Sequence, residues 1–174
     1  MTALSLDDAR RVLLDDSLRA LELVRATEGP VVDVGSGGGA PGLPLAFALP
    51  DREFVLLDAE RRKCDFLERW APPNARVVWG RAEEQPTDFG GVTLAKALAA
   101  PPVAAEWCLP LVRPGGVAIL WVGETADRAA VARVAGLLAA ELEDSESGLF
   151  VLRKTGPTPE GFPRRTGVAK RRPL

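Results

Sequence analysis

The sequence predicts an α/β protein whose mostly parallel, doubly wound sheet ends in an antiparallel hairpin. Short β-branched runs alternate with segments of helical periodicity along most of the chain, and a short polar turn separates the last two strand-like runs. Alternation of strands and helices is typical of a parallel sheet with helices on both faces. At 174 residues, the chain is long enough for one domain with its own core.

Helical spacing of apolar residues and helix-capping residues define the expected helices. The first begins after Ser5, an N-cap residue with an acid three positions later, and places leucines three or four residues apart. The second begins next to Pro41, which suits the first turn of a helix. The third places Cys64, Leu67 and Trp70 on one face. The expected helices cover residues 7–26, 42–49, 60–70, 103–111 and about 125–139.

Short apolar runs, several of them β-branched, define the expected strands. The first two carry acids near their carboxyl ends, Asp33 and Asp58. The expected strands cover residues 31–34, 53–58, 76–79, 91–96, 116–122, 141–144 and 149–153, with residues 145–148 as the turn of the final hairpin. The four tryptophans fall within expected helices and strands, which favours the core over an exposed platform for base stacking.

Charge is uneven along the chain. Residues 153–174 hold seven basic groups and one acid, so their formal charge is +6, whereas the other 152 residues carry −8. The last twenty residues have four prolines and three glycines and show no periodicity. We therefore expect a domain at residues 1–154, including the N-terminal helix, and an extended basic arm at residues 155–174.

Composition excludes several classes of function. The chain has no histidine and no tyrosine, which removes histidine-based triads and most zinc or iron sites. Cys64 and Cys108 lie 44 positions apart, which fits neither a metal site nor a redox pair, so we expect both as buried residues of a cytoplasmic protein. No apolar run approaches the roughly 18 residues of a membrane span, and the first residues lack a signal-peptide pattern. We expect no metal and no membrane partner.

A glycine-rich segment, GSGGGAPG, follows the first expected strand and has five glycines within eight residues. A backbone without Cβ atoms can approach a ligand closely, and ligands of doubly wound sheets lie beyond the carboxyl ends of the strands. Gly35, Gly37 and Ala40 satisfy the dinucleotide pattern G-x-G-x-x-G/A, with Asp58 about twenty residues further on. The same loop also suits S-adenosylmethionine, so by itself it leaves both cofactors open.

Three features favour the methyl donor over NAD. Asp33 lies just before the loop, where a carboxylate could meet a cationic amino group but would face a pyrophosphate unfavourably. Glu83 follows the third expected strand, where it could accept the adenine amino group. A hairpin ends the single nucleotide-binding unit, and the chain offers neither a second substrate domain nor the His or Tyr that a dehydrogenase would use.

Four segments together carry a more specific resemblance: DVGSGGGAPGLPLAFALP, LLDAERRKCDFLER, WGRAEE and TPEGFPRRTGVAKRRPL. From about residue 13 to 174, the chain resembles the 7-methylguanosine methyltransferases of small-subunit ribosomal RNA, also called glucose-inhibited division protein B. The resemblance implies a Rossmann-like class I methyltransferase fold and S-adenosylmethionine as cofactor, with S-adenosylhomocysteine as product. It also implies ribosomal RNA or the small ribosomal subunit as partner.

Carried over by position, the resemblance implies two sets of contacts. The cofactor set comprises Gly35, Gly37 and Ala40 at the methionine end, Asp58 and Ala59 at the ribose, Ala82 and Glu83 at the adenine, and Lys96 after the fourth strand. Ser36 in the loop and Asp33 just before it complete the residues expected to bind the cofactor. The RNA set lies in the basic arm and comprises Arg164, Arg165, Lys170, Arg171 and Arg172. No residue is assigned as a catalytic base.

The sequence departs from the family pattern at several positions. Leu13 stands where the family has a histidine, Lys96 where it has an arginine, and Val122 where it has a lysine; the family's additional N-terminal helices have no counterpart. A second hypothesis is therefore a cofactor-binding relative with another methyl acceptor or none. Guanine N7 has a lone pair and no proton to remove, so its methylation requires alignment and electrostatics rather than a general base.

Overall fold

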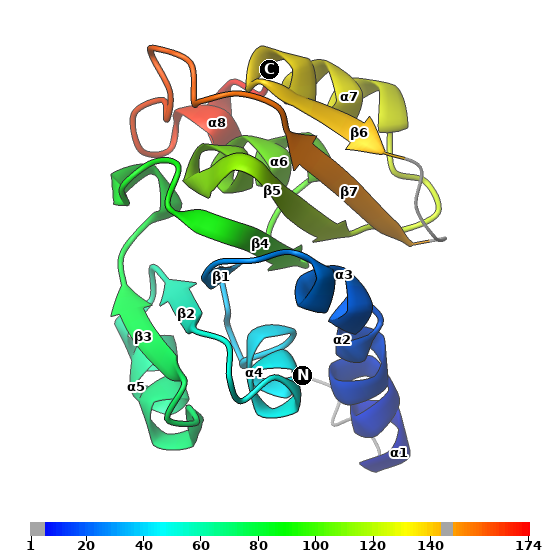
Figure 1. Ribbon diagram of the computed structural model, residues 1–174, viewed down its shortest axis with the longest axis vertical. Helices are drawn as coiled ribbons and strands as arrows, with labels where there is room; N and C mark the ends of the chain where they lie inside the picture. The colour runs from blue at the N-terminus through cyan, green and yellow to red at the C-terminus, as the bar shows by residue number, and fades with distance from the viewer. Residues whose placement is uncertain (1–5, 144–147) are drawn as a thin grey trace.

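The computed structural model describes residues 6–143 and 148–174. Seven strands of these residues form one sheet in the order β3-β2-β1-β4-β5-β7-β6 (Figure 1). The strands are β1 Val31–Val34, β2 Phe54–Asp58, β3 Ala75–Trp79, β4 Gly90–Lys96, β5 Val112–Trp121, β6 Ala140–Glu143 and β7 Leu149–Lys154. Strands β1 to β5 pair in parallel, and β7 pairs antiparallel with both β5 and β6. The expected mostly parallel, doubly wound sheet with a final hairpin is confirmed; most of the predicted turn lies outside the described residues.

The strand order reverses between β1 and β4. Strand β1 pairs with β2 on one side and with β4 on the other, and all three run in the same direction. The carboxyl ends of β1, β2, β3 and β4 therefore meet at one edge of the sheet, on both sides of the reversal. This is the place where doubly wound sheets bind ligands.

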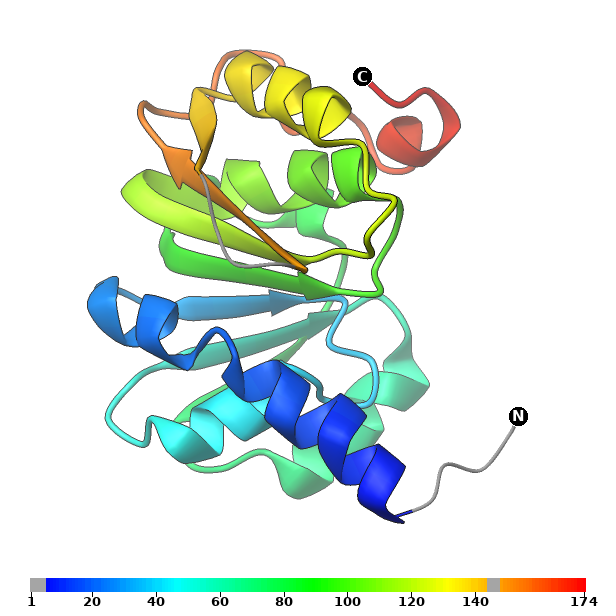
Figure 2. The same cartoon turned by 90° about the vertical axis from the view of Figure 1, so that its right-hand side faces the viewer.

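Helices cover both faces of the sheet (Figure 2). They are α1 Leu6–Ala9, α2 Asp16–Leu18, α3 Leu21–Ala26, α4 Gly42–Ala48, α5 Arg61–Trp70, α6 Pro101–Cys108, α7 Arg128–Leu137 and α8 Val168–Arg171. One cluster of buried apolar residues joins the sheet to α6 and α7, and a second joins its other face to α3 and α4. Both cysteines are buried, as expected.

The expected N-terminal helix is interrupted. Residues 10–15 form a π-helical turn between α1 and α2, and α3 begins only after a break at Ala20. The hydroxyl of Ser17, which is buried, donates a 2.5 Å hydrogen bond to Leu13 O, four residues earlier. Such back-bonding competes with the helical backbone pattern and bends helices, a signal that leucine periodicity does not contain.

The prediction that all four tryptophans lie in the core is wrong for two of them. Trp70 is 61% exposed at the end of α5, and Trp79 is 60% exposed at the end of β3. The guanidinium carbon of Arg61 lies 5.4 Å from the Trp79 ring centroid, within the range of a cation–π contact. These residues end their elements, where a side chain can turn outward without unpairing the backbone.

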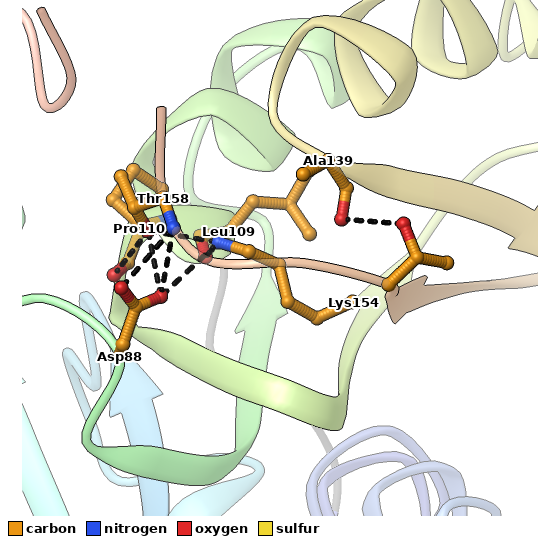
Figure 3. Close-up of polar contacts among 7 residues, drawn as sticks. Asp88, Leu109, Pro110, Ala139, Lys154 and Thr158 are labelled. Carbon is orange, nitrogen blue, oxygen red and sulfur yellow. Dashed lines mark hydrogen bonds and ion pairs between the residues drawn. The ribbon is translucent and has the colours of Figure 1, made fainter. Parts of the chain in front are cut away.

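Residues 155–174 are packed on the domain rather than freely extended. Figure 3 shows the contacts where this segment begins, around Lys154 and Thr158. The fully buried Lys154 Nζ donates to Leu109 O at 2.9 Å and to Thr158 Oγ1 at 2.8 Å, and pairs with Asp88 at 3.4 Å. Thr158 in turn donates to both Asp88 and Pro110 O. Further along, Ala169 of α8 is buried, and α8 contacts α6.

Candidate functional site

A cavity of about 310 Å³ opens at the carboxyl ends of β1, β2, β3 and β4. This volume is within the range of small-molecule sites. Segments far apart in the sequence line it: Val34, Gly35, Leu57, Asp58, Ala59, Glu60, Lys63, Gly80, Arg81, Ala82, Glu83, Ala97, Leu98, Trp107 and Lys170. Five predicted cofactor residues lie in this lining, namely Gly35, Asp58, Ala59, Ala82 and Glu83.

The glycine loop wraps one wall of the cavity. Gly35 N donates to Leu57 O at 2.7 Å, which ties the start of the loop to β2. Gly35 and Gly37 have φ values of 71° and 56°, a region that side chains with a Cβ rarely adopt. A Cβ at Gly35 would also lie 2.3 Å from the Leu98 side chain. The glycines are therefore needed for the shape of the loop as well as for an open approach.

Asp58 joins the loop to the cavity floor. It is 5% exposed and ends β2. Its Oδ2 accepts a hydrogen bond from Gly37 N at 2.9 Å, and its Oδ1 accepts one from Glu60 N at 2.8 Å. Each carboxylate oxygen can accept two hydrogen bonds, so both can still take a hydroxyl donor from the cavity. This is the arrangement required for a ribose diol.

Asp33 lies behind the loop rather than in the cavity. It is 1% exposed, and its Oδ2 accepts a 3.0 Å hydrogen bond from Gly42 N at the start of α4. Burial, augmented by the charge of Asp58, raises the pKa of Asp33 to about 7. The expected contact between Asp33 and a cationic amino group is thus not supported by the geometry, which favours a role in anchoring α4. Ser36 is also buried, and its Oγ donates to Asp33 O at 2.9 Å.

The opposite end of the cavity brings together three distant segments. Ala82 and Glu83 come from the turn after β3, Trp107 from α6, and Lys170 from α8. The Oε1 atom of Glu83 accepts a 3.0 Å hydrogen bond from Gly167 N, 84 residues later. The predicted adenine acid is therefore in contact with the segment that the sequence predicted as an RNA-binding arm.

Lys96 points away from the lining, toward the N-terminal helices. Its Nζ lies 2.7 Å from Asp16 Oδ2, and Asp16 O accepts a 3.0 Å hydrogen bond from Trp121 Nε1. Burial would raise the pKa of Asp16, but the hydrogen bonds from Lys96 and Arg19 outweigh it and lower the pKa. Lys96 thus holds α2 over the carboxyl end of β4, and its predicted cofactor contact stays a prediction.

The remaining predicted residues divide by exposure. Gly37 and Ala40 lie in the loop but do not line the cavity, and Gly37 N donates to Asp58 Oδ2. Arg164 is held in an ion pair with the buried Glu106. Arg165, Lys170, Arg171 and Arg172 are exposed and so are placed to meet a large partner, and Lys170 also lines the cavity. The lining residues Lys63, Arg81, Leu98 and Trp107 are not among the predicted cofactor residues. Lys63 follows β2 and Arg81 follows β3, and both strands end at the site. Their position after these strands is the feature of the sequence from which they could have been predicted.

Two structural absences hold for the described ranges 6–143 and 148–174. No group of three or more Cys, Asp or Glu side chains there could hold a metal ion. No helix within these ranges is long and apolar enough to cross a membrane.

Comparison with known families identifies the chain more closely. The family model GidB, described as rRNA small subunit methyltransferase G, matches residues 7–147. A protein named ribosomal RNA small subunit methyltransferase G from Synechococcus elongatus is 37% identical over 183 aligned residues, covering 91% of this chain and 75% of that protein. The protein of the same name from Rubrobacter xylanophilus is 37% identical over 192 residues, covering 96% of this chain and 70% of its own.

Solved structures show the same fold at low sequence identity. A TehB-like SAM-dependent methyltransferase from Corynebacterium glutamicum superposes with a TM-score of 0.61 at 18% identity, covering 80% of this chain and 87% of that one. A T. thermophilus 16S rRNA methyltransferase in complex with AdoMet and guanosine superposes with a TM-score of 0.57 at 17% identity, covering 81% of this chain and 40% of that one. The predicted family, the Rossmann-like class I methyltransferase fold and the enzyme class are confirmed. The chain belongs to the GidB family, rRNA small subunit methyltransferase G.

Proposed function

We propose that the protein transfers a methyl group from S-adenosylmethionine to guanine N7 in small-subunit ribosomal RNA. The observation that carries the proposal is the cavity at the strand-order reversal, which joins the glycine loop, Asp58 and Glu83 in a chain of this family. The glycine loop would contact the amino acid part of the cofactor, Asp58 its ribose and Glu83 its adenine.

The cavity fits this cofactor in its donors and acceptors. Gly35 exposes backbone beside Leu98, and the Asp58 carboxylate retains acceptor capacity for two hydroxyl groups. Glu83 provides an acceptor for an amino group at the far end.

The chain contributes binding and orientation to the reaction. When bound, S-adenosylmethionine supplies a methyl group on a sulfonium, which is already a good leaving group. Asp58 and the glycine loop would hold the sugar and the amino acid part, and the Lys96–Asp16 pair fixes α2 beside the carboxyl end of β4. Since guanine N7 carries a free lone pair, alignment of the base suffices and no side chain has to remove a proton. A chain without histidine or tyrosine is compatible with that chemistry.

The test is methyl transfer in vitro to small ribosomal subunits from cells that lack this protein. We expect labelled methyl groups from S-adenosylmethionine to appear in the RNA. Reduction followed by aniline treatment should cleave the RNA strand at the labelled nucleotide, as it does at N7-methylguanosine. Mass mapping of the fragments then identifies the base. The variant Asp58→Ala, supplied at the same cofactor concentration, should transfer little.

Two results would overturn this proposal. Methylation at another atom or in another RNA would leave a methyltransferase with a different acceptor. Binding of S-adenosylhomocysteine with no transfer to any ribosomal substrate would instead favour a relative that only binds the cofactor.

A further inference from the structure

We infer that the C-terminal segment, residues 155–174, is a wall of the cofactor pocket and that Arg164 is a positioning residue for adenine recognition. The inference rests on the proposed binding of S-adenosylmethionine in the cavity. It concerns a part of the chain that the sequence assigned only to RNA, and that lies beyond the residues matched by the family model.

The segment contacts the adenine end of the cavity at three points. Gly167 N donates to Glu83 Oε1 at 3.0 Å, and Thr166 Oγ1 donates to Glu84 Oε1 at 3.2 Å. Lys170, three residues after Gly167, lines the cavity itself. The hydrogen bond from Gly167 occupies one acceptor position of the Glu83 carboxylate, whose other acceptor positions can take an adenine amino group. The backbone amide of the segment therefore sets the direction in which this carboxylate points.

Arg164 holds the segment in this place. Its Nε and Nη2 donate to the two carboxylate oxygens of Glu106, both at 2.5 Å, and Nη2 also donates to Arg172 O at 2.9 Å. Glu106 lies on α6 and is 3% exposed, so water cannot replace the guanidinium as its partner. The hydrogen bonds with Glu106 raise the pKa of Arg164. A bidentate pair fixes orientation as well as distance. Together with the hydrogen bond to Arg172 O, it fixes both ends of the turn that presents Gly167.

Loss of Arg164 should loosen that turn without removing any group that touches the cofactor. The buried Glu106 carboxylate would be left without its cation, and the segment would move to rehydrate it. Glu83 would then lose the donor that orients it. The expected consequence is weaker discrimination of the adenine amino group, which differs from a general loss of affinity.

The test compares two ligands by titration calorimetry: S-adenosylhomocysteine and its 6-deamino analogue, which has hydrogen in place of the adenine amino group. The wild-type protein should prefer S-adenosylhomocysteine roughly tenfold or more, the value of a hydrogen bond to a charged acceptor. Arg164→Ala should reduce this preference to below about threefold. The control Arg165→Ala removes the neighbouring, exposed guanidinium and should keep the full preference.

A second pair of variants does not depend on the buried ion pair. Gly167 and Gly161 lie in the same segment with φ values of 78° and 86°, so alanine strains both positions alike. Gly167→Ala displaces the amide that donates to Glu83 and should lower the preference, whereas Gly161→Ala should not. Circular dichroism identifies any variant that has failed to fold.

The outcomes separate the two proposals. Failure of the wild-type protein to bind S-adenosylhomocysteine would contradict the proposed function. Binding without any preference, or a full preference in folded Arg164→Ala and Gly167→Ala, would overturn the positioning role while leaving the proposed function in place.

Discussion

Asp58 Oδ2 accepts a hydrogen bond from Gly37 N at 2.9 Å, so the acid expected at the ribose also holds the glycine loop in place. Because one side chain shapes two parts of the pocket, its removal should affect the whole cofactor site rather than one contact. Substitutions can separate the residues that form the pocket from those that support it.

Asp58→Ala should weaken S-adenosylhomocysteine binding by roughly 30- to 150-fold, since charge-assisted hydrogen bonds to a buried ligand contribute about 2–3 kcal/mol. Titration calorimetry measures the change. Asp51→Ala is the matched control, because Asp51 is an exposed acid in a different depression of the surface. A loss below threefold for Asp58→Ala would mean that this acid supports only the loop.

Gly37→Val should lower cofactor affinity at least tenfold, since a β-branched residue at a φ of 56° is strained. The strain would displace the backbone amide that donates a hydrogen bond to Asp58. The neighbouring Gly38→Val tests the explanation. Gly38 is exposed, and a Cβ there would meet nothing within 4 Å. We expect Gly38→Val to bind within threefold of the wild type; equal losses in both variants would point to side-chain bulk rather than backbone conformation.

Asp33→Asn should become progressively more stable than the wild type as pH rises from about 4 to about 7. Burial raises the pKa of Asp33 from 3.8 to about 7, so the folded protein binds this proton more tightly than the unfolded chain does. Its contribution to the free energy of unfolding is complete below about pH 4 and is lost as pH rises through about 7. Asparagine keeps an acceptor for Gly42 N and has no proton to lose.

Urea denaturation of both proteins at several pH values checks this prediction. The difference in the free energy of unfolding should grow by up to about 1.4 kcal/mol per pH unit within that interval. Parallel pH profiles would show that Asp33 remains ionised throughout, with its hydrogen bonds outweighing burial.

Lys154→Met should destabilise the fold by about 2–4 kcal/mol, because methionine fills the space but removes the cation paired with the partly buried Asp88 and one of the hydrogen bonds to Leu109 O. Chemical denaturation without cofactor provides the measurement. Lys170→Met changes an exposed lysine of the same segment, so its stability should stay within about 0.5 kcal/mol of the wild type. If both variants were equally stable, the cluster in Figure 3 would not anchor the C-terminal segment.

Arg165→Ala combined with Arg172→Ala should weaken RNA binding and flatten its salt dependence. Each phosphate contact that is lost should reduce the slope of log K against log salt by about 0.7 to 0.9, because fewer counterions are released. Filter binding over a series of salt concentrations gives the slope. Cofactor affinity should be unchanged within threefold, since both side chains are exposed and outside the pocket lining. An unchanged slope would place the RNA on another surface.

Local patterns were sufficient for most of the elements and for the centre of the site. Val31–Val34 and Phe54–Asp58 are short apolar runs bounded by turn residues, and both form strands close to the predicted bounds. Asp58 and the glycine loop follow strand ends that a doubly wound sheet brings together, so their proximity required only the fold class. Boundaries differed where a single side chain decided them: Asp127 accepts a 2.9 Å hydrogen bond from Ala130 N, so α7 begins later than expected.

The sequence by itself determined the fold class, the family and the acids at the strand ends, because these depend on residue spacing along one stretch of chain. Only the tertiary structure decided which acid faces the pocket. Asp33 pairs in register with Leu56, two residues before Asp58, so it lies deeper below the same edge and is covered by the loop. The tertiary structure also decided the hydrogen bond between Gly167 and Glu83. A contact across 84 residues depends on how α6 and the buried Glu106 position the end of the chain.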